Sequence, residues 1–316
     1  MHMSESGRRE VEHEIVVSAP AETLYRLIAE AEAWPQVFPP TILVDHLERG
    51  EHTERIRIWA TAKGEPKNWT SRRELDPAGL RITFRQESSA HPVASMGGTW
   101  IFEPLPAGRT RVRLLHDYRA AGDDPKHLAW IDEAVDRNSR SELDSLKEIA
   151  ENAATTAELT FSFTDTVHVA GSAKDVFDFI NEAQFWSERL PHVATVRLTE
   201  ESPGLQTLEM DTRARDGSTH TTKSYRVTFS PQRIAYKQVT LPALMKVHTG
   251  VWTFTEDDAG VSASSQHTVV LNTANIARVL GPDAGVAEAR EYVRTALSTN
   301  SRATLEHAKA YAEKNR

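Results

Sequence analysis

Apolar and polar residues alternate along several short segments of the chain, a pattern typical of β-strands with one buried face. The first segment, residues 15–20, ends in a small-residue turn and passes into residues 21–34. There Leu24, Tyr25 and Ile28 recur at the three- and four-residue spacing of an amphipathic helix. The pattern predicts a strand followed by a helix with one apolar face.

The chain contains this arrangement twice. Residues 29–39 (AEAEAWPQVFP) and 181–191 (NEAQFWSERLP) form the same aromatic corner, 152 positions apart. The same offset aligns residues 15–34 with residues 167–186 without a gap. An ordered series of matches at one offset indicates a duplication, and the unit is too long for a solenoid repeat, so each copy is expected to be a whole domain.

Each copy continues with about six strands and closes with one long helix. The turn residues that separate strands lie at 76–79, 106–108, 202–204 and 257–260. The closing helices match as residues 138–151 and 300–313, at an offset of 162. About ten extra residues therefore precede the second helix, where Gly281 and Pro282 break the chain.

These patterns predict domains over residues 8–152 and 159–314, joined by a linker over 153–159. Sequential strands with short turns predict an antiparallel sheet, and the long helix must bury its apolar stripe against the concave face of that sheet. A curved sheet around one helix leaves an internal cavity. The fold class is therefore α+β.

Composition excludes several classes of protein. The chain has no cysteine, so disulfides, thiolate metal sites and a cysteine nucleophile are excluded. No apolar run reaches the ~18–20 residues of a membrane span, and no signal peptide is recognised, so no membrane partner and a cytoplasmic location are expected. A net charge of −8 argues against nucleic acid as a partner.

Strand alternation in the first copy sorts side chains toward or away from the predicted cavity. The residues expected to point inward are Trp69, Ser71, Arg73, Met96, Trp100, Phe102, His116 and Tyr118. An apolar pocket with one cation and one imidazole suits a flat, oxygen-rich ligand. The alternatives are a buried ion pair for the arginine and a core position for the histidine.

The second copy keeps most of this set. His267 shares a strand face with Val269, and Ser224 and Arg226 align with the serine and arginine of the first copy. The opposite face of that strand carries Tyr225 and is the more apolar face, so either residue 225 or residue 226 could point inward. The N-terminal copy is the favoured active site on this basis.

At this point the sequence resembles the two-domain aromatase/cyclases of bacterial type II polyketide synthases. The resemblance rests on EAWPQVF (32–38), WTSRR (69–73), GGTWIF (97–102) and the ending HDY…NSRSELDSLK (116–118 and 138–147), and it recurs in the second copy. It implies tandem helix-grip (Bet v 1/START-like) domains, each a curved antiparallel sheet of about seven strands.

The resemblance also implies an activity. The expected substrate is a poly-β-ketone with one reduced ketone, tethered to an acyl carrier protein, and the expected reaction is first-ring cyclisation with aromatisation. Other type II polyketide synthase components are the expected partners. Arg73 matches the strand arginine of single-domain members and Trp34 their corner tryptophan, whereas Thr41 and His116 replace their usual Tyr and Gln.

Residue chemistry supplies roles for these groups. A cation such as Arg73 can stabilise negative charge on a carbonyl oxygen during ring closure, and an imidazole such as His116 suits proton transfer during loss of water. The candidate catalytic residues are Arg73, His116, Ser71, Arg226 and His267. The candidate substrate-binding residues are Trp34, Phe38, Trp69, Met96, Trp100, Phe102, Tyr118, Trp186, Ser224, Tyr225 and Trp252.

Competing hypotheses remain open from the sequence. A helix-grip domain can be a non-catalytic carrier for a lipid, sterol or aromatic ligand, or a chaperone of cyclisation that transfers no proton. A metal site is not expected, because the histidines are scattered, without an HExxH or paired-carboxylate spacing. No cofactor is implied. The oligomeric state is not predicted. A basic rim for the acidic carrier protein is expected from Arg72, Lys63 and Lys67, and from Lys223, Arg213 and Arg215.

Overall fold

The structure is a computed structural model that describes residues 7–213, 217 and 219–314. The chain forms two compact units that divide between Ala153 and Ala154. A short helix, α4 (Ala153–Leu159), occupies the expected linker.

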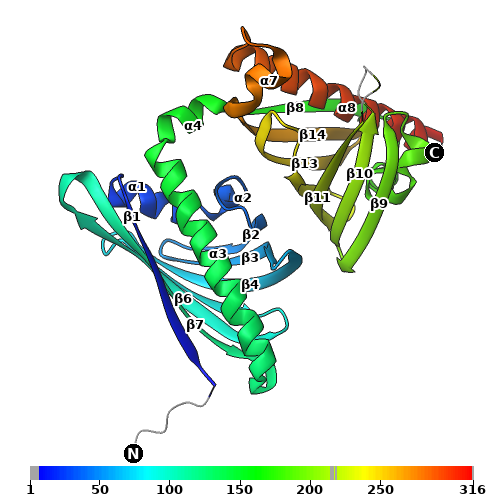
Figure 1. Ribbon diagram of the computed structural model, residues 1–316. Coiled ribbons are helices and arrows are strands. Elements are labelled where there is room, and N and C mark those ends of the chain that lie inside the picture. Colours follow the sequence, from blue (N-terminus) through cyan, green and yellow to red (C-terminus); the bar gives the residue numbers. More distant parts are fainter. Residues whose placement is uncertain (1–6, 214–216, 218, 315–316) are drawn as a thin grey trace, which may run out of the picture. The chain divides into compact units, whose positions relative to one another are not determined.

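In its described residues, the N-terminal unit is one antiparallel sheet with three α-helices and three single-turn 3-10 helices (Figure 1). Its elements are β1 (Arg9–Val17), α1 (Ala21–Ala29), α2 (Trp34–Val37), β2 (Thr41–Arg49), β3 (Thr53–Ala62), β4 (Glu65–Asp76), β5 (Arg81–Ser88), β6 (Val93–Leu105), β7 (Arg109–Ala120) and α3 (Pro125–Glu151). The seven strands have the order β1-β7-β6-β5-β4-β3-β2, so every hairpin joins neighbours and β1 pairs with β7.

The C-terminal unit repeats this plan. Its elements are β8 (Thr160–Val169), α5 (Ala173–Asn181), α6 (Trp186–Arg189), β9 (Val193–Ser202), β10 (Leu205–Arg213), β11 (Thr219–Phe229), β12 (Arg233–Thr240), β13 (Met245–Asp257), β14 (Gly260–Leu271), α7 (Ile276–Leu280) and α8 (Val286–Lys314). The strand order, β8-β14-β13-β12-β11-β10-β9, is the same. The extra residues of this copy form α7, which ends where Gly281 adopts a φ of 100°.

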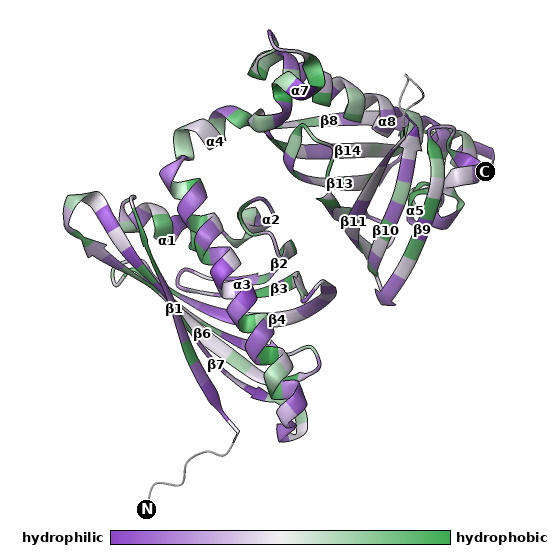
Figure 2. Ribbon diagram, viewed as in Figure 1, coloured by the Kyte–Doolittle hydropathy of each residue, from purple (hydrophilic) through white to green (hydrophobic). Residues whose placement is uncertain are grey.

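The long helices carry the largest buried stripes. Helix α3 starts at Pro125, where the Asp124 side chain accepts a hydrogen bond from the Lys126 backbone N–H at 2.7 Å. Both long helices begin well before the matched segments at 138 and 300. Figure 2 shows α3 as a mixture of hydrophilic and hydrophobic bands, as expected for a helix with one buried face.

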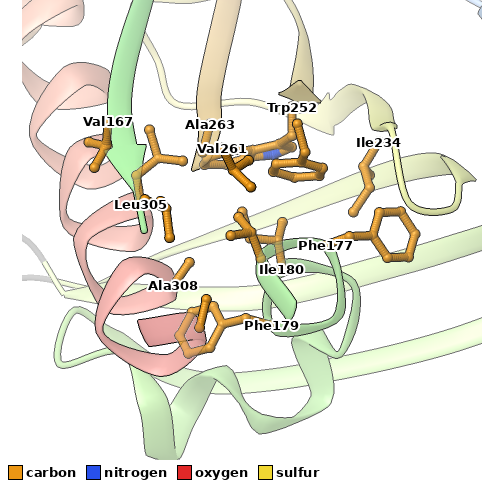
Figure 3. Close-up of a cluster of buried hydrophobic side chains, with 14 of the residues drawn as sticks. Val167, Phe177, Phe179, Ile180, Ile234, Trp252, Val261, Ala263, Leu305 and Ala308 are labelled. Atoms are coloured by element: carbon orange, nitrogen blue, oxygen red, sulfur yellow. The ribbon is translucent and has the colours of Figure 1, made fainter. Parts of the chain in front are cut away.

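The core of each unit lies between its sheet, its long helix and its first helix. In the C-terminal unit, Phe177 and Ile180 from α5 meet Leu305 and Ala308 from α8 and Trp252 from β13 (Figure 3). The predicted α+β fold, with a sheet of seven strands around a long helix in each copy, is therefore confirmed. Within the described residues no helix is long and apolar enough to cross a membrane.

Candidate functional site

The repeated corner is held by one arginine in each domain. Arg73 on β4 donates to the carbonyl oxygen of Ile28 at 2.6 Å, and its guanidinium lies 4.9 Å from the ring centroid of Trp34. The Trp34 indole N–H donates to the same carbonyl at 3.2 Å. Through these two hydrogen bonds, the corner joins the C-terminal end of α1 to the inner face of the sheet.

The C-terminal domain repeats this contact. Arg226 on β11 donates to the carbonyl oxygen of Ile180 at 2.7 Å and lies 5.5 Å from the ring centroid of Trp186. The Trp186 indole N–H donates to Phe179 O at 3.3 Å. Arg226 lines the C-terminal cavity together with Ser224, so residue 226 points inward; Tyr225 is not among the lining residues, and the expectation that it lines the cavity is wrong. Alternate residues of a strand point to opposite faces, which places Tyr225 on the other side.

The two arginines differ in their counter-ions. The Glu54 carboxylate accepts from Arg73 Nη1 at 2.8 Å, and both side chains are almost fully buried. Gln206 occupies the equivalent position beside Arg226, and Nη1 of Arg226 is buried without a hydrogen-bond partner among the described residues. Burial lowers the pKa of both arginines to about 10, so each keeps its charge at neutral pH. The N-terminal cation is neutralised by an ion pair, while the C-terminal one is available to a ligand.

Arg226 faces a cavity of about 130 Å³ inside the C-terminal domain. Its walls include Trp186, Ser224, Trp252 and His267 as expected, and also Tyr236, Gln238 and His248 from the sheet and Asn300, Ser301 and Thr304 from α8. Apolar walls with a few convergent polar groups are typical of a small-molecule site. The sequence analysis missed Tyr236, Gln238 and His248, although alternation around Trp252 and Ile234 places them on the inner face.

Two histidines in this cavity belong to one hydrogen-bond network. His248 Nδ1 lies 2.8 Å from Gln238 Oε1, and His248 Nε2 lies 3.0 Å from His267 Nδ1. His267 Nε2 lies 3.1 Å from Ser265 Oγ, and the Tyr236 hydroxyl lies 3.0 Å from His267 Nδ1. Since Gln238 Oε1 only accepts, His248 Nδ1 carries a proton. The remaining bonds follow if His267 Nδ1–H donates to His248 Nε2 and to the Tyr236 oxygen, and if the Ser265 hydroxyl donates to His267 Nε2.

This network is satisfied with both imidazoles neutral. Burial, with a smaller contribution from His267, lowers the pKa of His248 to about 3, and burial lowers the pKa of His267 to about 4. Burial also raises the pKa of Tyr236. At neutral pH these groups are therefore hydrogen-bond donors and acceptors without charge, and Arg226 supplies the positive charge of the cavity wall.

A glycine allows the tyrosine to reach the histidine. Tyr236, Gly250 and His267 pair across neighbouring strands, and a Cβ at Gly250 would lie 2.4 Å from the Tyr236 hydroxyl. In the N-terminal domain Phe84 crosses Gly98 in the same way, with its ring centroid 5.5 Å from that of His116. The tyrosine hydroxyl is therefore a feature of the C-terminal copy.

The N-terminal inner face has its own polar groups. Ser71 Oγ, Gln86 Oε1 and His116 Nδ1 are buried and lack hydrogen-bond partners within the described part of the chain. Burial, aided by the nearby His13, lowers the pKa of His116 to about 4. His116 therefore points inward as expected, but it is a neutral group. Gln86 was not identified from the sequence.

Other expected residues take structural positions. Phe38, Trp100 and Phe102 stack on one another in the N-terminal core, with successive ring centroids 6.4 Å apart. The Tyr118 hydroxyl donates to Asp132 of α3 at 2.6 Å. Trp69 packs against the buried residues of β3. The Gln86 side-chain Nε2 donates to the Met96 sulfur at 3.5 Å. Phe38 and Phe102 are 2% exposed, so they contribute to packing more than to a ligand surface.

The expected basic rim is largely paired with acidic residues. Arg72 meets Glu87 at 3.2 Å, Lys67 meets Glu65 at 3.1 Å, and Lys63 meets Glu133. In the second copy Lys223 meets Glu209 at 3.1 Å and Arg213 donates to Pro191 O at 3.3 Å. Arg215 lies outside the described residues. These carboxylates reduce the positive charge that the rim offers.

Among the same described residues, no group of three or more His, Asp or Glu side chains is arranged to hold a metal ion. The two histidines of the C-terminal cavity pair with each other and with Gln238, Ser265 and Tyr236. The histidines of this cavity therefore bond to neighbouring side chains and do not form a metal site.

The neutral histidine pair should make the C-terminal domain sensitive to acid. The unfolded chain binds protons near pH 6.5, whereas folded His248 and His267 stay neutral down to about pH 4. The free energy of unfolding should therefore fall as the pH drops from about 6.5 to about 4, by up to ~1.4 kcal/mol per pH unit and per histidine. Denaturant unfolding across this range measures the slope, and a His248→Gln/His267→Gln variant should show a shallower one. Equal slopes would contradict the assignment.

Comparison with known proteins places the chain in a family. The family model described as "Polyketide cyclase / dehydrase and lipid transport" matches residues 8–151 and again residues 160–313. The granaticin polyketide synthase bifunctional cyclase/dehydratase of Streptomyces virginiae is 56% identical over 93% of this chain and 97% of its own length. The actinorhodin polyketide synthase bifunctional cyclase/dehydratase of Streptomyces coelicolor is 46% identical over 98% of this chain and 99% of its own.

Two crystal structures share the whole architecture. The di-domain ARO/CYC BexL from the BE-7585A biosynthetic pathway is 67% identical, with a TM-score of 0.86 over 96% of this chain and 99% of that one. The di-domain ARO/CYC StfQ from the steffimycin biosynthetic pathway is 34% identical, with a TM-score of 0.85 over the same shares. With two matched domains and this site, the chain belongs to the polyketide cyclase/dehydrase and lipid transport family, as a two-domain aromatase/cyclase of the type II polyketide synthase class.

Proposed function

We propose that this enzyme closes and aromatises the first ring of a ketoreduced poly-β-ketone held on an acyl carrier protein. The observation that carries the proposal is Arg226: a buried guanidinium with a free Nη1, facing a cavity and lacking a carboxylate partner. A charge buried in this way is costly unless a ligand satisfies it. A carbonyl oxygen that becomes negative during the reaction is such a ligand.

Ring closure needs polarisation more than strong base. A methylene between two carbonyl groups is already acidic, and its carbanion attacks a second ketone of the same chain. Nη1 of Arg226 would donate to the oxygen of that ketone, which gains negative charge as the carbon–carbon bond forms. One such donor in a water-poor site is worth ~10²–10³ in rate.

The neutral network would fix the fold of the chain. Tyr236 can donate to a substrate carbonyl without gaining or losing charge, because burial raises its pKa. Trp186, which lies against the arginine, and Trp252 supply apolar walls of the cavity. Holding two distant carbons of a flexible chain in contact is an orientation effect that contributes several kcal/mol to the barrier. In this proposal Ser224 and His267 position the chain.

The partners in this proposal are the acyl carrier protein and the other components of the synthase. The carrier protein would deliver the chain to the cavity mouth, and the ketoreductase of the same synthase would act first. The enzyme would work in the cytoplasm with these components. Arg73, Ser71 and His116 would contact the chain inside the N-terminal domain, where Arg73 acts mainly through its pair with Glu54.

The direct test reconstitutes a minimal polyketide synthase with a ketoreductase, with and without the purified protein, and analyses products by mass spectrometry. We expect a new first-ring aromatic product only when the protein is present. An unchanged product profile, combined with tight binding of the substrate-like polyketides, would instead identify a carrier of the kind found elsewhere in helix-grip proteins.

A further inference from the structure

A glutamine on the fifth strand of each sheet has a different partner in each domain. Gln86 lies on β5 and Gln238 lies on β12, 152 positions later, and they pair with Ser71 and Ser224 of the neighbouring strands. In the C-terminal domain His248 Nδ1 donates to Gln238 Oε1 at 2.8 Å. The two copies share the glutamine and the serine, so the partner of the glutamine oxygen can be compared between them.

Methionine replaces this histidine in the N-terminal domain. Met96 aligns with His248 at the same offset, and its sulfur accepts a hydrogen bond from Gln86 Nε2 at 3.5 Å. A thioether sulfur has no hydrogen to donate, so the amide nitrogen faces Met96 and the amide oxygen does not. Gln86 Oε1 is buried and has no hydrogen-bond partner among residues 7–213, 217 and 219–314. A buried acceptor of this kind requires a donor that these residues do not supply.

The duplication shows to which side of the sheet this glutamine points. Gln238 and His248 both line the C-terminal cavity, so the equivalent Gln86 and Met96 are assigned to the inner face of the N-terminal sheet. Strand alternation agrees, because Gln86 lies an even number of positions after Ile82, which belongs to the N-terminal core. The unpartnered oxygen therefore belongs to the interior of the N-terminal domain.

Two further polar atoms of this interior lack partners. Ser71 Oγ and His116 Nδ1 are buried without a hydrogen bond to any described residue, so Ser71 does not donate to Gln86. A serine hydroxyl and a neutral imidazole can each donate or accept, whereas the carbonyl oxygen of an amide only accepts. A secondary alcohol can donate to this oxygen and accept from a second group. A ketone has no hydrogen to donate and would leave the glutamine oxygen unsatisfied.

We propose that Gln86 is a specificity-determining residue that accepts a hydrogen bond from the hydroxyl group of the ketoreduced chain, an inference that rests on the proposed function. A site that bonds a substrate hydroxyl discriminates against the analogue without it, because the buried polar group of the site then loses its partner. One such bond corresponds to a preference of ~10–100-fold for the alcohol over the ketone. Gln238 does not make this distinction, since its oxygen is already bonded to His248.

The first test compares carrier-bound chains made with and without the ketoreductase, using the full-length protein in the reconstituted synthase. The wild type should convert the reduced chain ~10–100-fold faster than the unreduced one. Gln86→Met removes the acceptor at similar side-chain length and should lose this preference. Met96→His should lose it too, because its imidazole would occupy the glutamine oxygen as His248 does in the second domain. Thr83→Val, on the outer face of the same strand, is the matched control and should keep the preference.

A second measurement needs no catalysis. The probes are β-tetralol and β-tetralone, which share one carbon frame and differ only in carrying a hydroxyl or a ketone. The chain has seven glutamines, so isotope labelling of glutamine side-chain nitrogen gives few NMR signals, and the Gln86 signal is the one absent from Gln86→Met. Titration with the alcohol should shift this signal, and the ketone should bind ~10–100-fold more weakly.

The two tests fail in different ways. Equal effects of the two probes on the Gln86 signal, or an unchanged preference in a folded Gln86→Met variant, overturn the role of Gln86. If the wild type forms no aromatic product while the Gln86 signal still responds to the alcohol and not to the ketone, the proposed function fails and Gln86 remains a hydroxyl acceptor.

Discussion

Replacing Arg226 by alanine is expected to lower the rate of aromatic product formation by ~10²-fold or more. The variant removes the unpaired donor that would stabilise the oxyanion of ring closure, which is the largest electrostatic contribution available in the C-terminal cavity. The measurement is the initial rate of product formation in the reconstituted synthase, with folding checked by circular dichroism and thermal unfolding.

The protein should survive this substitution. Arg226 has no buried carboxylate whose charge would be left uncompensated, and its loss removes the bond to Ile180 O and the contact with Trp186. Lys223→Ala, three positions earlier on β11 and on the opposite face, is the matched control and should retain activity. A folded Arg226→Ala variant with wild-type product rates would remove the C-terminal cavity from the mechanism.

The equivalent change in the first domain should have its main effect on stability. Arg73→Ala leaves Glu54 buried with its charge unpaired by the arginine, and breaking a buried ion pair from one side costs ~3–5 kcal/mol. For a domain of this size, that loss corresponds to a fall of about 10 °C in the unfolding temperature. Scanning calorimetry on the full chain measures it.

The C-terminal copy supplies the control for this prediction. It has Gln206 where the first copy has Glu54, so Glu54→Gln reproduces an arrangement that the same fold already accommodates. We expect Glu54→Gln to cost much less than Arg73→Ala, and a Glu54→Gln/Arg73→Ala double variant to recover part of the loss. If Arg73→Ala and Glu54→Gln were equally mild, the ion pair would have little structural weight.

The equivalent arginines Arg73 and Arg226 differ in function, one in an ion pair and one with a free donor. The same side chain joins the corner to the sheet in both domains, through a helix carbonyl and a tryptophan ring. One carboxylate, present in one copy and absent from the other, decides whether the remaining guanidinium nitrogen is committed to the protein or free for a ligand. The duplication has therefore kept the architecture while the chemistry of the two interiors diverged.

Much of this could be predicted from the sequence, for a definite reason. Strand alternation depends only on local backbone geometry, so the inward positions of Arg73, His116 and His267 followed from the pattern. The Trp corner is also a local signal, and its recurrence at an offset of 152 residues indicated the duplication. The turn residues marked hairpins that the sheets contain.

Pattern alone did not resolve the strand at Arg226. Both faces of that strand carry large residues, and burial depends on which one the long helix and the corner cover. The ion pair between Glu54 and Arg73 could not be predicted either. The two residues lie on neighbouring strands, and the register that pairs them is fixed only when the sheet forms.

The sequence by itself determined the fold class, the duplication, the inward rows of side chains and the family. These features are set by periodicities and spacings that extend over one element at a time. The tertiary structure decided which charges are paired, which polar atoms are left without partners and what the pKa values become. Those properties depend on side chains that packing brings together from several elements, and on the removal of water from the space between them.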